Sequence, residues 1–583
     1  MLSVKTDKIK LNNTENIIQN LILWILSFVS SVLFLLFYST ATSPLTSYYG
    51  EDSAFYAMVG AAMKHGMLPY RDFYEMKGPY MFWIEYFGQL ISEGRFGTFC
   101  IQTINMTLTI GIILCIVNLL LKKMTIKKIQ RFVIYICSVL FSLLIISFTF
   151  EGGNLTEEFS YPVMVLCLYL CLRYFDDQDC SPVSAHSLKI GFIYGMAFGF
   201  FAFVRIINAA FLGAVLLTIV IYLISKKNWK NILQNAVVFI AGVIVAMLPA
   251  CIWALTQGIL KDMIRQVFVL AFSYSTELNM ADRFMLVKNF VWPMIVIGMV
   301  SIFLYFTGFK KKWPLLLLSV SSAVILLIAV SMGDGYLHYF SLQLPNAVLA
   351  LYFLISACLG NCETDINDSS YCRESVQENN LSNIQKETQE KNLGNTKKES
   401  QKNDEENVLE KIEKDNQNNF DKNKTLHIIR IVLSVCIVIL AIGMQKDVIR
   451  DKTLAIANYT IQSVRQGNPD EGDVAYIQDV MGQIPDEEKD SVYLYGFGSC
   501  SQWYAKAGIF PPNKYCDWQP HWIILYPEIK AELLDYIGSH SAKWIVLSNG
   551  GEIWPDEIKN SIYENYTEFF VNDYYILLHE KVE

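Results

Sequence analysis

Three side chains in one polar stretch of the sequence have types and a spacing suited to group transfer. Glu51 and Asp52 are adjacent acids in the string GEDSAFY, and Lys77 precedes Gly78 and Pro79 in the string LPYRDFYEMKGP. A carboxylate can take a proton from an acceptor hydroxyl, and an ammonium group can neutralise a phosphate leaving group. The structural alternatives are that the acids cap a helix N-terminus and that Lys77 anchors at a membrane interface. Their combination in one segment favours the chemical interpretation.

Further candidate residues lie downstream at the ends of apolar runs. Arg205 either anchors at the membrane interface or makes a second phosphate contact, for which its fork of donors is suited. Glu157 and Glu158 are either solvated loop acids or side chains that line the acceptor side of the site. His338 either binds phosphate or a metal ion or belongs, with Tyr339, to an aromatic belt, and both residues are candidates to line the acceptor or donor side of the site.

The composition indicates a membrane protein. The chain has 583 residues, of which 53% are hydrophobic and 17% charged, against roughly 25% charged in soluble proteins. Of the 102 charged residues, 25 fall within the stretch 361–424. This balance argues against a soluble multidomain enzyme, a nucleic-acid-binding protein and a disulfide-stapled secreted domain.

Apolar runs predict about eleven membrane-spanning helices, because a bilayer core of about 30 Å needs about 20 apolar residues per helix. None of the predicted spans contains Asp or Glu, which argues against ion-coupled transport. The predicted spans are residues 17–38, 99–121, 132–148, 161–175, 190–204, 206–225, 232–255, 289–307, 313–331, 339–359 and 426–444.

Lysine and arginine predict the orientation. If the N-terminus is cytoplasmic, the inner loops 122–131, 226–230 and 310–312 carry 11 Lys or Arg in 18 residues, and the opposite loop 150–160 carries none. The segment 47–94 is then extracytoplasmic. It contains two amphipathic stretches that predict helices lying along the membrane interface. We expect a plasma membrane, and an endoplasmic-reticulum membrane would show the same topology.

The chain divides into four predicted regions. Residues 1–360 form a multi-span membrane domain, 361–424 a disordered cytoplasmic linker without a recognisable partner motif, and 425–445 the last span. Residues 446–583 form a small extracytoplasmic α/β domain, with strands at 491–497 and 543–548, a helix at 527–537 and an edge strand or hairpin at 569–578.

The cysteines give no metal-binding pattern, since no CxxC or Cys/His spacing occurs. Most lie in apolar runs, where a thiol behaves as a small hydrophobe. Cys500 and Cys516 share one polar region and either form a disulfide or remain free, because spacing alone does not decide the geometry.

The first polar segment resembles a known family. The strings GEDSAFY and LPYRDFYEMKGPYMFW are similar to the first outer loop of GT-C glycosyltransferases of the protein O-mannosyltransferase-like type, which include lipid A aminoarabinose transferases. The resemblance continues with NLTEEFSYP, with the arginine in FAFVRIINAAF and with GYLHYFSLQLP, and covers about residues 45–345. Where some members have Lys-Pro-Pro, this chain has Lys77-Gly78-Pro79.

The resemblance implies a GT-C-like fold and the transfer of a hexosyl or pentosyl group from a polyprenyl-phosphate donor, with inversion at the anomeric carbon. Asp52 matches the general base, Glu51 its neighbour that orients acceptor or donor, and Lys77 the lysine near the lipid phosphate. Arg205 is the second candidate phosphate contact. The acceptor would be an envelope polysaccharide, a glycolipid or a protein. The leaving group is already good, so the chemistry requires no metal ion or other cofactor, and a divalent cation stays open.

Two other functions remain alternatives. A lipid-linked oligosaccharide flippase or other transporter predicts internal repeats and a polar path through the bundle, and the sequence shows neither. In the second, the membrane region is a scaffold and the tail 446–583 is a binding module.

Overall fold

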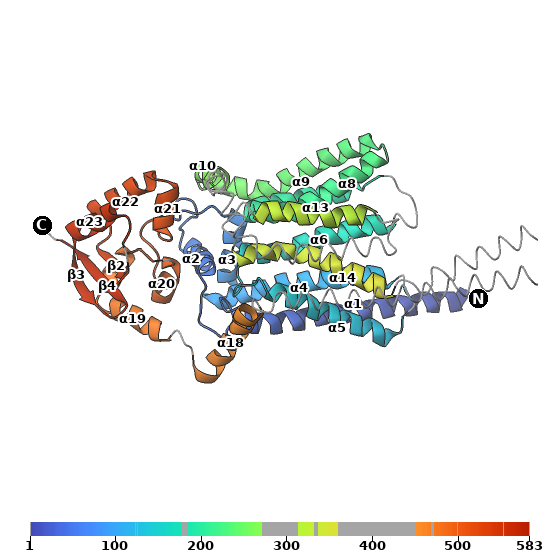
Figure 1. Cartoon of the computed structure of the whole chain (residues 1–583), viewed down its shortest axis with the longest axis horizontal. Helices are drawn as coiled ribbons and strands as arrows, with labels where there is room; N and C mark the ends of the chain where they lie inside the picture. Colours follow the sequence, from blue (N-terminus) through green and yellow to red (C-terminus); the bar gives the residue numbers. More distant parts are fainter. Residues whose placement is uncertain are drawn as a thin grey trace, which may run out of the picture.

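The computed structural model describes the chain at residues 2–122, 124, 126–177, 185–270, 313–330, 336–359, 449–467, 471–497, 499–551 and 553–581. The predicted spans 289–307 and 426–444 and the predicted linker 361–424 lie outside these residues. Figure 1 shows a bundle of long helices with a small α/β domain at one end, which carries the C-terminus.

The bundle consists of long apolar helices that lie side by side (Figure 1). In the described part of the chain, eight helices are long and apolar enough to cross a membrane, and α7 is a shorter apolar helix. These nine coincide with nine of the predicted spans, which confirms a multi-pass helical membrane protein. They are α1 (Leu2–Tyr38), α4 (Arg95–Leu121), α5 (Lys128–Ser147), α6 (Thr156–Asp177), α7 (Leu188–Val204), α8 (Ala210–Ser225) after the turn η1 (Ile206–Ala209), α9 (Trp229–Thr256), α13 (Trp313–Val330) and α14 (Leu344–Leu359) after η4 (Leu337–Gln343).

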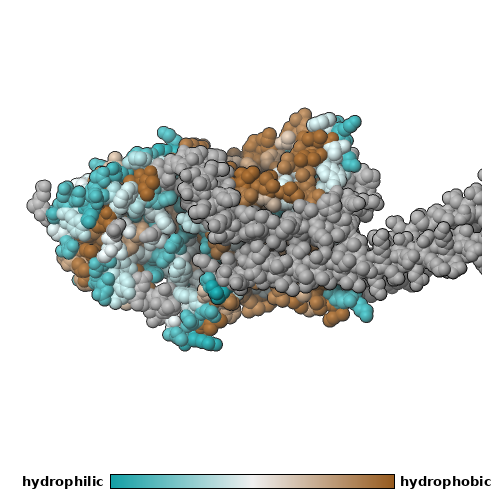
Figure 2. Space-filling view, in the orientation of Figure 1, coloured by the Kyte–Doolittle hydropathy of each residue, from teal (hydrophilic) through white to brown (hydrophobic). Residues whose placement is uncertain are grey.

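The outside of the bundle is apolar, as expected where side chains face hydrocarbon instead of water. Leu233, Val237 and Ile240 on α9 are 58 to 69% exposed. Figure 2 shows apolar side chains gathered over the bundle, whereas the C-terminal domain is mainly hydrophilic. Small residues allow α7 and α9 to approach closely. A Cβ atom on Gly195 would lie 2.0 Å from the Phe239 carbonyl oxygen.

Two shorter helices cover the end of the bundle next to the C-terminal domain: α2 (Asp52–Lys64) and α3 (Pro79–Ile91) (Figure 1). Proline at the first position of α3 suits a helix start, where its missing N–H has no intrahelical partner. Phe87, Leu90 and Ile91 on α3 are more than half exposed, as an interfacial helix requires. Helix α2 is more enclosed than an interfacial helix, because α3 and α20 (Cys500–Ala507) of the C-terminal domain pack against it.

The C-terminal domain contains a four-stranded sheet in the order β1-β2-β4-β3. β1 and β2 are parallel, and the hairpin β3/β4 adds antiparallel strands. The predicted strands, the helix at 527–537 and the hairpin alternative for 569–578 are therefore confirmed. Its elements are α18 (Ala455–Gln466), α19 (Glu471–Met481), β1 (Val492–Tyr495), α20, α21 (Gln519–Leu525), α22 (Glu528–Gly538), β2 (Trp544–Ser548), α23 (Asp556–Asn565), β3 (Tyr566–Val571) and β4 (Tyr575–Glu580), with short turns η5 (Ile449–Leu454) and η6 (Asp486–Ser491).

Of the two alternatives for Cys500 and Cys516, the structure shows free thiols. Both side chains are buried in the domain, at 0 and 1% exposure. Burial raises the pKa of both thiols well above the usual value, so they are neutral core groups.

A buried acid connects α3 to its neighbours. Glu85 is fully buried, and its Oε2 accepts a hydrogen bond of 2.8 Å from the Thr98 hydroxyl of α4. Gly60 of α2 packs directly on it, since a Cβ atom there would lie 2.4 Å from the Glu85 Cβ. Burial raises the pKa of Glu85 to about 7, although hydrogen bonds from Thr98 and Asn154 act in the opposite direction.

Glu85 therefore makes stability depend on pH. Below the pKa of the unfolded state, the carboxyl group is protonated in both the folded and the unfolded chain, and its contribution to the stability of the fold is fully present. As pH rises through about 7, ionisation favours the unfolded chain, and this contribution to the free energy of unfolding is lost. We expect Glu85→Gln, which stays neutral, to gain about 3 kcal/mol relative to wild type between pH 4.5 and pH 8. Thermal unfolding in detergent micelles measures this difference. Glu93→Gln, at an exposed site, is the control. Parallel pH profiles for Glu85→Gln and wild type would contradict the prediction.

Candidate active site

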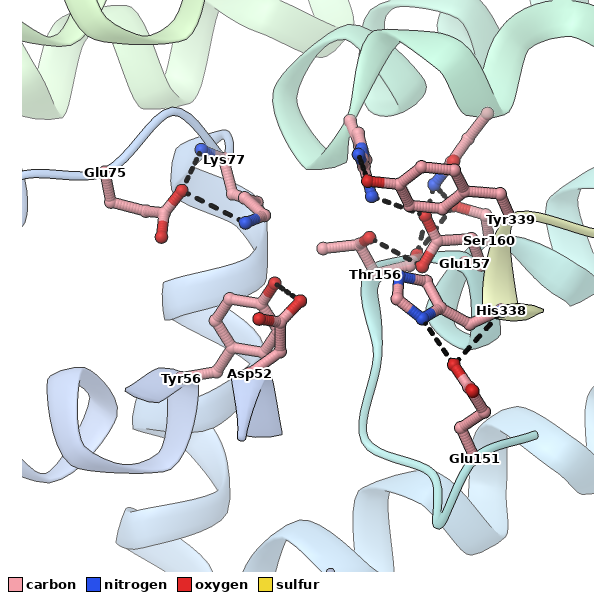
Figure 3. Close-up of polar contacts among 12 residues, drawn as sticks. Asp52, Tyr56, Glu75, Lys77, Glu151, Thr156, Glu157, Ser160, His338 and Tyr339 are labelled. Carbon is pink, nitrogen blue, oxygen red and sulfur yellow. Dashed lines mark hydrogen bonds and ion pairs between the residues drawn. The ribbon is translucent and has the colours of Figure 1, made fainter. Parts of the chain in front are cut away.

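A cavity of about 930 Å³ lies between the end of the bundle, the segment that carries α2 and α3, and the C-terminal domain. Its middle is charged and its bundle side is apolar, with side chains from α7, η1, α8 and α13. Figure 3 shows Asp52, Tyr56, Glu75 and Lys77 on one side, facing His338 and Tyr339 on the other. Asp52 and Tyr56 belong to α2, Glu75 and Lys77 to the loop before α3, and His338 and Tyr339 to η4.

Asp52 is the first residue of α2, where the partial positive charge of the helix N-terminus favours a carboxylate. Its Oδ2 accepts a hydrogen bond of 3.3 Å from the hydroxyl of Tyr56, one turn later. Burial alone raises the pKa of Asp52, but the charges of Lys77, His338 and Arg205 outweigh burial and lower the pKa below its usual value. Asp52 is thus an ionised carboxylate in a partly closed cavity.

Glu51 lies at the N-cap of α2 and also lines the cavity. Burial raises the pKa of Glu51, and the neighbouring carboxylates of Asp52 and Glu151 raise it further. The two adjacent acids therefore have opposite electrostatic environments. Asp52 is therefore the more readily ionised of the two acids, and Glu51 the more readily protonated.

Lys77 is held in the cavity wall by its neighbours in the loop. Its Nζ lies 3.3 Å from Glu75 Oε1 and 5.7 Å from the centre of the Tyr56 ring. The same Glu75 oxygen accepts hydrogen bonds from the backbone N–H groups of Met76 and Lys77. Although burial opposes it, the charges of Glu75, Tyr56 and Asp52 raise the pKa of Lys77 well above its usual value. The ammonium group therefore stays charged.

Arg205 follows the last residue of α7 and lines the cavity. It donates from Nη1 to Glu157 at 2.9 Å and from Nη2 to the Tyr339 hydroxyl at 2.6 Å. Its guanidinium also lies 4.2 Å from the centre of the Tyr339 ring. Arg205 is therefore a cation that its neighbours hold inside the cavity. This fits a phosphate contact better than it fits an anchor whose side chain extends freely to the membrane interface.

Glu157 and Glu158 are 1 and 2% exposed, so they are not solvated loop acids. Neither is among the residues that line the described cavity, and a role on the acceptor side stays a prediction. Glu157 forms an ion pair with Arg205. Glu158 accepts hydrogen bonds from the Gln102 side chain at 2.8 Å and from the Asn154 backbone at 2.7 Å. The start of α6 packs against α4, which buries these acids, and a sequence pattern does not report that packing.

His338 lines the cavity opposite Asp52. Its Nδ1 lies 2.8 Å from Glu151 Oε2, and its backbone N–H donates to the same oxygen at 3.2 Å. The pair connects η4 with the loop before α6. Within the described residues, no three His, Cys, Asp or Glu side chains are grouped so that they could hold a metal ion.

The cavity contains functional candidates that sequence reasoning missed. Glu75 and Tyr56 carry a local signal, because they lie two residues before Lys77 and one helical turn after Asp52. Asp517, Trp518 and His521 of the C-terminal domain also line the cavity, and no spacing in the sequence connects them to the site.

No protein-family model and no curated protein matches this sequence. The similar solved structures include ArnT from Cupriavidus metallidurans bound to undecaprenyl phosphate. The two sequences are 13% identical, the match covers 95% of this chain and 97% of that chain, and the TM-score is 0.49. The apo state of ArnT gives 12% identity, the same coverage and the same TM-score. The Archaeoglobus fulgidus oligosaccharyltransferase is 13% identical, and the match covers 90% of this chain and 68% of that chain with a TM-score of 0.41.

With identities of 12 to 13% and TM-scores below 0.5, these matches carry no argument about family, reaction or substrate. The function proposed below therefore rests on the geometry of the site.

Gly78 explains the departure from Lys-Pro-Pro. Its N–H donates to the Val204 carbonyl at 3.0 Å, a bond that proline could not make, and a Cβ atom would lie 2.1 Å from the Phe203 carbonyl oxygen. The close approach fixes Lys77 beside the end of α7.

We expect Gly78→Ala to force this loop away from α7 and to destabilise the protein by about 1–3 kcal/mol. Thermal unfolding in micelles measures the loss. Gly213→Ala is the matched control, because nothing lies within 4 Å of its added methyl group. An unchanged melting temperature for Gly78→Ala would refute the close contact.

Proposed function

We propose that this protein is an integral membrane glycosyltransferase that transfers a sugar from a polyprenyl-phosphate donor to an acceptor of the cell envelope. One observation carries the proposal: an ionised acid, Asp52, faces the cations Lys77 and Arg205 in a cavity whose bundle side is apolar. The three groups match the needs of a hydroxyl attack on a carbon that is bonded to phosphate.

The apolar side of the cavity fits the lipid part of such a donor. Phe198, Ala202, Ile207, Ile325 and Ile328 line it, and all belong to helices or turns of the bundle. A polyprenyl chain entering from the bilayer would contact these side chains, and its phosphate would then meet Lys77 and Arg205. A fixed ammonium and a planar guanidinium are suitable partners for phosphate oxygens.

The reaction needs one base and a stabilised leaving group. The acceptor hydroxyl loses its proton to Asp52 while its oxygen bonds to the anomeric carbon. The bond from that carbon to the phosphate oxygen breaks, and the lipid phosphate leaves with one more negative charge. Lys77 and Arg205 stabilise this charge as it develops, which is the larger effect in such reactions. Attack opposite the leaving group inverts the anomeric carbon, and no step requires a metal ion.

The positive-inside bias supports the orientation that we propose. The site would lie on the outer face of the plasma membrane, with the N-terminus cytoplasmic and the C-terminal domain extracytoplasmic. The transferred group would be a hexosyl or pentosyl unit.

We expect Asp52→Asn to reduce transfer by about 10²–10⁴-fold, because the amide cannot accept the hydroxyl proton. Mass analysis of envelope glycans, in cells that carry the variant as their sole copy, measures the loss against wild-type and deleted cells. Asp262→Asn, at an exposed position outside the cavity, is the control. Normal glycosylation by a well-folded Asp52→Asn protein would contradict the assignment of Asp52 as the base and would favour the flippase alternative.

We expect Lys77→Met to weaken binding of undecaprenyl phosphate by about 10–100-fold, since a charged hydrogen bond contributes about 1.5–3 kcal/mol. Titration of the purified protein in micelles with this lipid gives the affinity. Lys64→Met removes a lysine that pairs with the exposed Glu93 and should bind normally. Equal affinities for Lys77→Met and wild type would contradict the proposed phosphate site.

A further inference from the structure

The C-terminal domain contributes Asp517, Trp518, His521 and Trp522 to one side of the cavity that contains Asp52 and Lys77. Trp518 and Trp522 lie on this side, and Tyr74 from the loop before Lys77 joins them. Tyr74 and Trp522 meet edge to face, with ring centres 5.3 Å apart. We call Tyr74, Trp518 and Trp522 the aromatic wall. Asp517 and His521 line the cavity beside it.

The aromatic wall is fastened to the loop that carries Lys77. The Tyr74 N–H donates to the Lys514 carbonyl at 2.9 Å, and the Tyr74 ring also contacts Tyr515 at 5.2 Å. On the domain side, Trp522 stacks on Tyr526. The wall and the proposed phosphate site therefore have a fixed relative position.

Trp518 has an unusual backbone conformation. Its φ of 52° and ψ of 31° lie in the left-handed region, which bulky residues seldom adopt. Asp517, which is 5% exposed, maintains the turn: its Oδ1 accepts from the N–H groups of Trp518 at 3.1 Å and of Cys500 at 2.8 Å, and its Oδ2 accepts from the Ser501 hydroxyl. Backbone strain of this kind is often found at ligand-binding positions. Here the strained residue, Trp518, is part of the cavity lining.

The chemistry of this side differs from that of the bundle side. Broad aromatic faces next to an imidazole suit a ring that has apolar C–H faces and hydroxyl edges. A hydrocarbon chain needs no such polar neighbours, and the cavity already has a purely apolar region between α7, α8 and α13. The ligand of the aromatic wall is therefore distinct from the donor lipid.

The position of the wall indicates which substrate it binds. Helix α2, with Asp52 at its start, lies between the bundle and the C-terminal domain (Figure 1). If the lipid phosphate leaves toward the bundle, an inverting attack must come from the opposite side. That side is the one formed by the C-terminal domain.

We propose that the aromatic wall, with His521, is the acceptor subsite and that it binds a sugar ring of a glycan or glycolipid acceptor. The inference rests on the proposed function and narrows its acceptor from polysaccharide, glycolipid or protein to a molecule that presents a sugar. Asp517 is a positioning residue, since its oxygens hold Trp518 and the start of α20.

The test measures binding to the full-length protein in micelles saturated with undecaprenyl phosphate. The probes are defined tetrasaccharides, namely maltotetraose, chitotetraose and mannotetraose, and a hexapeptide containing Asn-Val-Thr. Quenching of intrinsic tryptophan fluorescence gives the affinity. We expect at least one tetrasaccharide to bind saturably, and Trp518→Ala to weaken it at least tenfold without changing the affinity for undecaprenyl phosphate.

Two further variants distinguish the loss of a sugar contact from misfolding of the domain. Trp518→Phe keeps an aromatic face and should lose less affinity than Trp518→Ala, and His521→Ala should weaken binding without altering the strained turn. Trp554→Ala, which removes an exposed tryptophan of the same domain outside the cavity wall, should bind like wild type.

Three results would overturn the inference: no saturable binding of any tetrasaccharide, tetrasaccharide binding that Trp518→Ala and His521→Ala leave unchanged, or binding of the peptide alone. Each differs from failure of the proposed function. If undecaprenyl phosphate binds and depends on Lys77 while no tetrasaccharide binds, only the acceptor subsite is wrong. If the lipid does not bind, the proposed function itself fails.

Discussion

The site depends on the pairing of charges that have been taken out of bulk water. Lys77 lies 3.3 Å from Glu75 and Arg205 lies 2.9 Å from Glu157, so each cation has its own carboxylate. Moving an ion out of water costs several kcal/mol even after relaxation, and an unpaired cation would turn toward solvent. Pairing keeps both cations in the cavity wall, where their field also keeps Asp52 ionised.

The loop that carries these charges is held from three directions, which explains why distant parts of the chain must assemble around it. The Gly78 N–H donates to Val204 at the end of α7, and the Tyr74 N–H donates to Lys514 of the C-terminal domain. From η2 (Arg265–Leu270), the buried Gln266 side chain accepts from the Glu75 N–H and donates to the Tyr70 carbonyl. The C-terminal domain is thus part of the site's architecture, and a scaffold with a separate binding module does not describe this contact.

Features whose physical cause is local could be predicted from the sequence. The bilayer demands long apolar helices, and short apolar runs mark the buried strands β1 and β2, so nine spans and these strands of the C-terminal domain were predicted. Asp52, Lys77 and Arg205 stood out because they are charged residues beside apolar runs. The burial of Glu157 and Glu158 could not be predicted from the sequence because it depends on how α6 packs against α4. The aromatic wall was missed because only the tertiary fold brings residues 517–522 near Asp52.

The two aspartates of the cavity show why one base is sufficient for the proposed reaction. Burial, with a smaller contribution from the charge of Asp52, raises the pKa of Asp517 to about 7, whereas that of Asp52 is lowered. Opposed environments of this kind often mark an acid and a base. Here, however, the oxygens of Asp517 are occupied by Cys500, Ser501 and Trp518, so its proton is not directed at a substrate. In the proposed reaction the lipid phosphate would leave without protonation, because Lys77 and Arg205 would stabilise its charge. The raised pKa of Asp517 reflects its burial in a turn that positions Trp518, so Asp52 remains the one base of the proposed reaction.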